Sequence, residues 1–190
     1  MEIILMRHGE TAWNTQRRLQ GCRDIPLTEH GKEQIRIAGC HLAAKKLHID
    51  HIISSPLGRA SESAQIVAAA LNYPISSIKT STFFLERSFG VCEGMTYEEA
   101  MGQYPDGQYP GMETIDQLYE RAAKGLKWLE TNYPDQTVLV TSHGAFIKAA
   151  LGIASDGRIA YFDKDIWIDN GDCCILEKQT SDWAISVIKH

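Results

Sequence analysis

Three short polar clusters in this sequence combine residue types that can bind an anion and transfer a phosphoryl group. They are Arg7-His8-Gly9, Ser54-Ser55-Pro56 leading to Arg59, and Ser142-His143-Gly144. Arginine offers a planar fork of N–H donors that matches phosphate oxygens, and a neutral imidazole can attack phosphorus and form a covalent intermediate. Two arginines and two histidines that meet in one pocket would therefore form a site for a phosphate dianion.

Each cluster directly follows a segment that we predict to be a buried strand. The segments 2–6, 51–54 and 137–141 are short and apolar, and 172–176 and 183–188 predict two further strands. In open α/β sheets, ligands bind at the carboxyl ends of the strands. If the first three strands are parallel, Arg7, His8, Arg59 and His143 reach one pocket at that edge.

The strands alternate with segments of helical periodicity. We predict helices that begin at Thr28, after Pro56, at Thr114 and near Gly144, and a short helix over 97–101 capped by Thr96. This order predicts an α/β fold with three α/β/α layers and a mostly parallel central sheet, in a single domain over 1–190. The segment 83–111, rich in Gly and Pro, has the least regular pattern, and we expect a small lid there.

The bulk composition limits the partners. The 190 residues have a formal net charge of −5, which argues against non-specific nucleic-acid binding because that requires basic stripes. The five cysteines have no regular spacing and predict neither a disulfide framework nor a zinc site, so we expect no metal and no cofactor. Adjacent Cys173 and Cys174 on a strand would point to opposite faces.

The sequence has no apolar run of about 20 residues, the length that a membrane span requires. It also shows no pattern of a secretory leader at its first residues. We therefore expect a cytoplasmic protein that binds a small phosphorylated substrate, without a membrane or nucleic-acid partner. An exposed edge strand near the C-terminus leaves both a monomer and a homodimer open.

The clusters are part of a longer series of motifs that resembles a known family. In chain order, the motifs are Leu5-Met6-Arg7-His8-Gly9-Glu10-Thr11, Leu19-Gln20-Gly21 with Asp24-Ile25-Pro26-Leu27-Thr28, Ser54-Ser55-Pro56-Leu57-Gly58-Arg59-Ala60, Leu85-Glu86-Arg87-Ser88-Phe89-Gly90 with Glu93-Gly94, and Ser142-His143-Gly144. An Arg-His-Gly tripeptide alone is a weak signal, whereas five ordered motifs over about 150 residues are specific. The chain is similar in these motifs to the histidine phosphatase superfamily, also called the phosphoglycerate mutase-like family.

The resemblance implies a role for each matching residue, without a metal. His8 is the nucleophile that becomes phosphohistidine, and Glu86 protonates the leaving oxygen and then activates water. General acid catalysis of this kind contributes about 10²–10⁴-fold. The catalytic set is His8, Glu86, His143, Arg7 and Arg59, and the residues implied in phosphate or substrate binding are Thr11, Asn14, Gln20, Gly21, Arg87, Gly144 and Ala145. Glu93 lies close to Glu86 in the sequence and is the other carboxylate that could be the donor.

The superfamily contains both hydrolases and phosphoglycerate mutases, and the sequence favours a hydrolase. The mutases carry a longer insert between the donor Glu and the second His, with paired arginines for the substrate carboxylate. Here only the 56 residues 87–142 intervene, and the basic residues after Arg87 lie on one predicted helix. Gln20 also replaces the Thr that mutases usually show. The expected activity is hydrolysis of small phosphorylated metabolites.

Two alternatives stay open. The pair Glu86-Arg87 resembles the mutase Glu-Arg pair, in which the arginine contacts the substrate, so mutase-type phosphotransfer is the first. A regulatory phosphate-binding member, or one that acts on phosphoproteins, is the second and is less favoured. All of His8, Arg59 and His143 are present, whereas a member without activity could have lost them.

Overall fold

The central sheet of the computed structural model, which describes residues 1–161, 167–179 and 182–189, is mostly parallel. Within these ranges six strands form one sheet in the order β3-β2-β4-β1-β5-β6. The strands are β1 (Glu2–Arg7), β2 (His51–Ser54), β3 (Lys79–Thr80), β4 (Thr137–Ser142), β5 (Cys173–Lys178) and β6 (Trp183–Ile188). The strands from β3 to β1 pair in parallel, whereas β5 pairs antiparallel with β1 and with β6.

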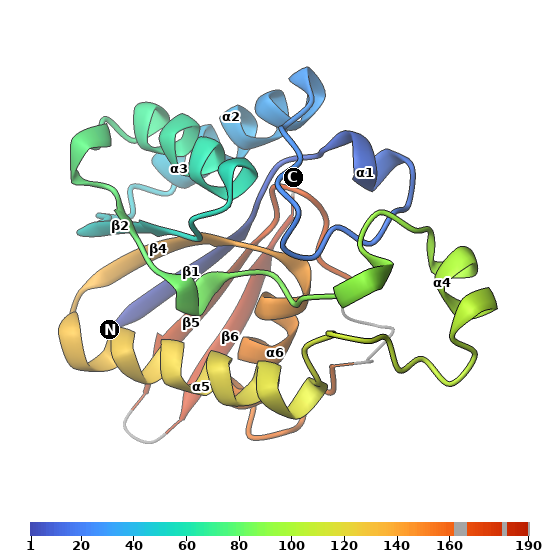
Figure 1. Ribbon diagram of the computed structural model, residues 1–190. Helices are drawn as coiled ribbons and strands as arrows, with labels where there is room; N and C mark the ends of the chain where they lie inside the picture. The colour runs from blue at the N-terminus through green and yellow to red at the C-terminus, as the bar shows by residue number, and fades with distance from the viewer. Residues whose placement is uncertain (162–166, 180–181, 190) are drawn as a thin grey trace.

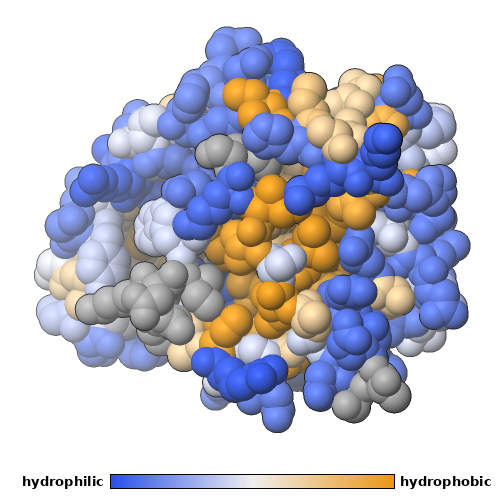
Figure 2. Space-filling model, turned by 180° about the vertical axis from the view of Figure 1, so that it is seen from behind, coloured by the Kyte–Doolittle hydropathy of each residue, from blue (hydrophilic) through white to orange (hydrophobic). Residues whose placement is uncertain are grey.

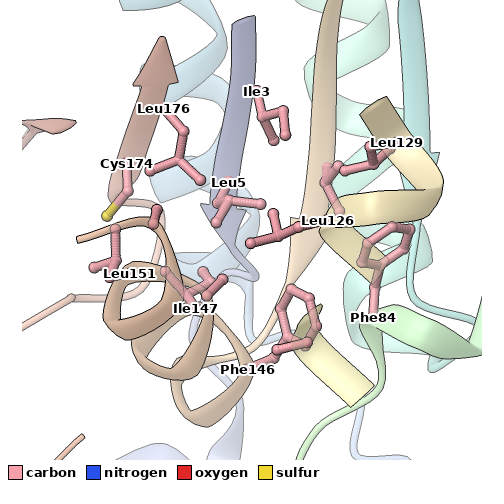
Figure 3. Packing of buried hydrophobic residues seen from close by; sticks show 14 of the residues in the cluster. Ile3, Leu5, Phe84, Leu126, Leu129, Phe146, Ile147, Leu151, Cys174 and Leu176 are labelled. Carbon is pink, nitrogen blue, oxygen red and sulfur yellow. The ribbon is translucent and has the colours of Figure 1, made fainter. Parts of the chain in front are cut away.

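Helices cover both faces of this sheet (Figure 1), which confirms the predicted α/β/α layers. Helices α2 (Glu29–Ala44) and α3 (Gly58–Ala70) pack on one face, and α5 (Ile115–Asn132) and α6 (Gly144–Ala154) on the other. Because successive strand residues point to opposite faces, β1 contributes to both cores. Ile3 and Leu5 join the α5/α6 core, where Figure 3 shows them beside the helix residues, and Ile4 and Met6 join the α2/α3 core.

The predicted helix starts are confirmed. Helices α3 and α6 begin at Gly58 and Gly144 without a side-chain cap, whereas threonines cap the other three. The Thr28 side chain accepts from Gly31 N at the start of α2, and Thr96 and Thr114 form capping boxes at α4 (Tyr97–Gln103) and α5. The adjacent cysteines of β5 also lie as expected, since Cys173 joins one core and Cys174 the other. Burial raises the pKa of Cys174 to about 12, so this thiol stays protonated.

The sequence pattern missed the shortest elements. Helix α1 (Ala12–Thr15) has four residues and β3 has two, and the 3-10 helices η1 (Ile75–Ser77), η2 (Thr82–Phe84) and η3 (Gly90–Cys92) have three each. None is long enough to show a hydrophobic period. Most of them lie in the segment that follows α3, which in Figure 1 crosses to the side of α1 and α4 at the carboxyl end of β1. A bridge between Arg18 and Thr96 joins the two regions there.

The surface opposite the view of Figure 1 carries a central apolar area surrounded by hydrophilic residues (Figure 2). The edge strand β6 lies on that rear side, and its Val187 is 44% exposed. The alternatives of a monomer and a homodimer stay a prediction. In the described ranges, none of the helices combines the length and the hydropathy that a membrane span requires.

Candidate active site

The strand register places the three polar clusters side by side. Arg7 of β1 pairs with Ser142 of β4, and Ser54 of β2 pairs with Thr141 of the same strand. Because these strands are parallel neighbours, the residues that follow them emerge at one edge of the sheet. The ring centroids of His8 and His143 are consequently only 5.1 Å apart, with the ring planes at 60°.

His8 is held as a neutral imidazole in which Nε2 is the unprotonated nitrogen. Its Nδ1 lies 2.7 Å from the carbonyl oxygen of Gly9, and because a carbonyl can only accept, we assign the proton to Nδ1. Burial, reinforced by the charges of Arg59 and Arg7, lowers the pKa of His8 well below its ordinary value. Nε2 is therefore unprotonated at neutral pH, and its lone pair accepts from Arg59 Nε at 3.3 Å.

Arg59 is fully buried, and every nitrogen of its guanidinium has a partner. Besides Nε, Nη1 donates to Arg23 O at 2.6 Å and Nη2 donates to Gly21 O at 2.8 Å. Gly21 has a φ of +53°, and a Cβ at this position would overlap the carboxylate of Glu93. Only glycine therefore brings this carbonyl to Arg59 without strain. The loop that contains Gly21 fixes the guanidinium beside His8.

Two buried nitrogen atoms of the site have no hydrogen-bond partner among the described residues, namely Arg7 Nε and His143 Nδ1. Arg7 Nη1 donates to Ile168 O at 2.6 Å, and His143 Nε2 lies 2.8 Å from Ser55 Oγ. Because the Ser55 hydroxyl accepts from Leu57 N and can donate to Nε2, we assign the proton of His143 to Nδ1, so both unpartnered nitrogens are N–H donors. Burial lowers the pKa of His143 well below its ordinary value. A buried unsatisfied polar group costs about 1–3 kcal/mol. Both atoms therefore require an acceptor that a bound anion can supply.

Glu86 lies beside this cluster, in the irregular segment after η2. Its Oε1 accepts from Arg87 N at 2.9 Å and from Ala145 N at 3.2 Å, in the first turn of α6. Burial raises the pKa of Glu86, although the two backbone donors and the arginines Arg59 and Arg7 oppose this shift. A carboxyl group with a raised pKa next to a nucleophile is suited to general acid catalysis.

Glu93, the other carboxylate considered as the donor, has a different position. Its Oε1 accepts from Cys22 N at 3.0 Å and from Phe89 N at 3.1 Å. These bonds join the loop of Gly21 to the segment that carries Glu86. Glu93 therefore serves to hold these two loops together, and Glu86 is the carboxylate that lines the cavity next to Arg7.

Thr11, Asn14 and Gln20 form a hydrogen-bonded group after the His8 turn. Thr11 Oγ1 lies 3.0 Å from Asn14 Oδ1 and 2.9 Å from Gln20 Oε1. Asn170 joins this group, since its Nδ2 donates to His8 O at 2.9 Å and lies 3.4 Å from Asn14 Oδ1. The structure thus brings the three predicted residues close to the nucleophile, and their contact with phosphate stays a prediction.

A cavity of about 630 Å³ lies beside Arg7, the one member of the cluster that lines it. Its walls include Arg7, Glu86, Gly144, Ala145, Tyr161 and Trp167. Arg87 lines a neighbouring cavity of about 680 Å³, and the two cavities share Leu19, Phe89 and Tyr161. Arg87 is 8% exposed, donates from Nε to Glu113 O at 2.8 Å, and lies over the rings of Phe89 and Tyr161. It is therefore a wall residue, separate from the cluster around His8.

Sequence reasoning missed several residues that hold the site. Ser55 and Ser63 contact His143 and the backbone of Gly9, and Asn170 contacts the backbone of His8. Ser55 stands within a recognised motif, which could have signalled its role. Asn170 lies more than 160 positions after His8 and outside every motif, so no local pattern marks it.

In the part of the chain that the structure describes, no group of three or more His, Cys, Asp or Glu side chains is placed to hold a metal ion. The chemistry of the clustered groups, two guanidiniums and two imidazoles, instead suits an anionic ligand. A metal-independent reaction stays a prediction that activity measurements can test.

Comparison with known proteins gives consistent results. Residues 3–190 match the family described as histidine phosphatase superfamily (branch 1). "Uncharacterized phosphatase PhoE" of Bacillus subtilis (strain 168) is 42% identical over 155 residues, which cover 82% of this chain and 78% of that protein. "Probable phosphoglycerate mutase GpmB" of Klebsiella pneumoniae subsp. pneumoniae is 33% identical over 198 residues and 98% of this chain, and 89% of that protein is covered.

Solved structures give the same picture. "Bacillus stearothermophilus YhfR" superposes with a TM-score of 0.87 at 26% identity, covering 98% of this chain and 95% of that chain. The order of strands and helices is thus shared with a chain of similar size, and the predicted phosphoglycerate mutase-like fold is confirmed.

Proposed function

The chain belongs to the histidine phosphatase superfamily, and on this premise we propose that it hydrolyses small phosphate monoesters through a phosphohistidine on His8. One observation carries this proposal. A neutral imidazole whose unprotonated Nε2 accepts only from Arg59 stands among two buried N–H donors, Arg7 Nε and His143 Nδ1, that have no acceptor in the described part of the chain. Phosphoryl oxygens would accept from both donors while phosphorus faces His8.

The first half of the reaction transfers the phosphoryl group to the enzyme. The phosphate dianion accepts from Arg7, His143 and Arg59, and the loss of the Arg59 bond frees the lone pair of His8 Nε2. Nε2 attacks phosphorus, the bond from phosphorus to the ester oxygen breaks, and Glu86 transfers its proton to that oxygen. The charge on the equatorial oxygens is stabilised by donors that are already fixed, which is the main source of catalysis in phosphoryl transfer.

The second half of the reaction regenerates the enzyme. Glu86, now a carboxylate, takes a proton from a water molecule whose oxygen attacks phosphorus. The bond from phosphorus to Nε2 breaks, inorganic phosphate leaves, and His8 is neutral again. Glu86 ends protonated, as it began, so the cycle balances without a metal or a redox partner.

The leaving group occupies the cavity of about 630 Å³ that Glu86 lines. This volume lies within the range of small-molecule sites, about 300–1,000 Å³. Aromatic walls at Tyr161 and Trp167 suit an organic leaving group, and the segment 83–111 closes the site on that side as a small lid. We therefore propose small phosphorylated metabolites as the substrate class.

Mutase-type phosphotransfer is the second candidate, because a relative named as a phosphoglycerate mutase matches 98% of the chain at 33% identity. A mutase returns the phosphoryl group to a second position of the substrate before water reaches it. Incubation with 3-phosphoglycerate and 2,3-bisphosphoglycerate separates the two. A mutase forms 2-phosphoglycerate, and a hydrolase releases inorganic phosphate.

The decisive experiment measures release of p-nitrophenol from p-nitrophenyl phosphate with excess chelator, for the wild type beside His8→Ala. The proposal expects wild-type turnover that survives the chelator and is abolished in the variant. His30→Ala is a matched control, because His30 is an exposed histidine on α2. Activity that the chelator abolishes, or that persists in His8→Ala, would contradict the mechanism.

A further inference from the structure

The backbone around Glu86 is held by one arginine from a distant helix. Arg121 on α5 donates from Nη1 to Phe83 O and to Leu85 O, at 2.8 Å each, and its Nη2 lies 3.5 Å from Glu86 O. Three carbonyls of four successive residues thus face a single guanidinium. Such a set of bonds restricts the position of the whole segment, because the planar fork cannot satisfy them in another arrangement.

Ser142 completes this arrangement from the opposite side. Its Oγ donates to Phe84 O at 2.8 Å, the one carbonyl of the four that Arg121 leaves out. Ser142 is the last residue of β4 and directly precedes His143. The segment that carries Glu86 is therefore attached both to α5 and to the strand that carries the second histidine.

Arg121 is in turn fixed and neutralised by Glu113. Arg121 Nε lies 2.8 Å from Oε1 of Glu113 and Nη2 lies 2.7 Å from Oε2, a bidentate pair. Both side chains are less than one-fifth exposed. The carbonyl of Glu113 also accepts from Arg87, the residue after Glu86. Because the pair has no net charge, it holds the backbone of Glu86 without adding an uncompensated charge beside the carboxyl.

We propose that Arg121, paired with Glu113, is a positioning residue that sets the carboxyl of Glu86 within reach of the leaving oxygen. The inference rests on the proposed role of Glu86 as proton donor. Arg121 contacts backbone atoms, Glu113 and the ring of Phe146, and it does not line the cavity beside Arg7. Its charge is paired with Glu113, so in this proposal it affects turnover through the position of Glu86. Loss of its fork should impair proton transfer and leave phosphoryl binding at Arg7, Arg59 and His143 intact.

The test compares two substrates that differ in the need for a proton. Arg121→Lys keeps the charge next to Glu113 but removes the fork. Since a misplacement of about 1 Å can lower a rate about 10²-fold, we expect kcat/KM for phenyl phosphate to fall about 10–100-fold. For p-nitrophenyl phosphate, whose leaving group needs little protonation, we expect a change below about threefold. Lys124→Ala, on the exposed face of the same helix, is the control and should change neither value.

A second measurement places Arg121→Lys in a Glu86→Gln background. If Arg121 acts through Glu86, its substitution adds almost nothing once the proton donor is gone, and the two effects are strongly non-additive. Equal losses on both substrates, or fully additive effects, would overturn the inference. If Glu86→Gln by itself lowers kcat/KM equally for both substrates, the proposed role of Glu86 is overturned as well. The result for this single variant therefore distinguishes failure of the inference on Arg121 from failure of the proposed role of Glu86.

Ser142→Ala keeps the inference testable if Arg121→Lys is unfolded by circular dichroism. This variant removes one hydroxyl and the bond to Phe84 O, and it leaves the charged pair intact. The same selective loss on phenyl phosphate is expected, with a smaller size. A loss of the same factor on both substrates would overturn the positioning role here too.

Discussion

The active site consists of two halves that are held by different means. The strand-end half, Arg7, His8, Arg59 and His143, follows parallel strands or opens a helix directly after one, so that the sheet register places it. The loop half, Glu86 and Arg87, lies in an irregular segment that side chains from α5 and β4 hold in place. A single substitution cannot shift the strand register and so cannot easily move the strand-end half. A single substitution can remove one of the side-chain contacts that hold the loop half.

The halves also differ in what they offer to a ligand. Within the described residues, the strand-end half keeps two buried donors without an acceptor, whereas Glu86 and Arg87 already have backbone partners. In the proposed function, the strand-end half binds the phosphoryl group that all substrates share. The loop half lines the two cavities, where the proposal places the leaving groups. The proposal thus separates recognition of phosphate from choice of substrate.

The largest expected effect comes from the strand-end half. Arg59→Met should lower kcat/KM for every phosphate monoester by about the same factor, on the order of 10³, because loss of one preorganised donor costs about 10²–10³-fold. The measurement uses a series of substrates whose leaving groups differ in pKa. The plot of log kcat/KM against the leaving-group pKa should shift downward without a change of slope. Arg36→Met, on the exposed surface of α2, is the control. A loss that depends on the leaving group would break the proposed separation.

The loop half should respond in the opposite manner. Glu86→Gln should lower kcat/KM for phenyl phosphate about 10²-fold and that for p-nitrophenyl phosphate much less, since general acid catalysis contributes most when the leaving oxygen is basic. The same substrate series therefore shows a steeper slope instead of a parallel shift. An unchanged slope would mean that Glu86 is not the acid.

The strand-end half could be predicted from the sequence, and the reason is physical. Its residues follow short apolar segments, and the bounds of β2 and β6 agree with the predicted ones. Once parallel strands are assumed, the residues after them must meet at one edge. Local patterns alone thus fixed both the fold class and the set of Arg7, His8, Arg59 and His143 as neighbours.

What supports the loop half could not be predicted in this way. Arg121 was visible only as a polar residue on an amphipathic helix, and its contact with Phe83 and Leu85 joins positions more than 35 residues apart. Glu86 was found only through the resemblance to a family. The two-residue strand β3 and the helix α1 are too short to have a period. Contacts that single side chains make with distant residues leave no trace in a local sequence pattern.

A smaller effect is expected in the pH dependence. The pKa of Glu86 is raised above its ordinary value by burial, and in the proposed mechanism the protonated form is the acid. Turnover of phenyl phosphate should therefore be full below the pKa of Glu86 in the folded enzyme and fall up to about tenfold per pH unit above it. Glu86→Gln should lack this alkaline limb, and p-nitrophenyl phosphate should show a weaker one. Identical profiles for the two substrates would place the limb on another group.

The smallest expected effect concerns stability, and its sign differs between the halves. His8 and His143 have pKa values well below their ordinary value because burial disfavours the charged form. The unfolded chain takes up these protons below about pH 6.5. The free energy of unfolding is therefore at its full value above that pH. As the pH falls toward the folded pKa values, each of the two histidines lowers it by about 1 kcal/mol per pH unit. The free energy of unfolding in urea at pH 7.5 and 5.5 measures this.

Substitution of a residue in each half separates the two contributions. His143→Gln should reduce the loss of stability between pH 7.5 and 5.5, whereas His30→Gln, at an exposed position, should not. Glu86 has a raised pKa, so its contribution is present below its unfolded pKa and is lost as the pH rises through the folded one. Glu86→Gln should accordingly make the protein lose more stability on acidification than the wild type. If both variants changed the pH dependence in the same direction, the two halves would not be electrostatically distinct.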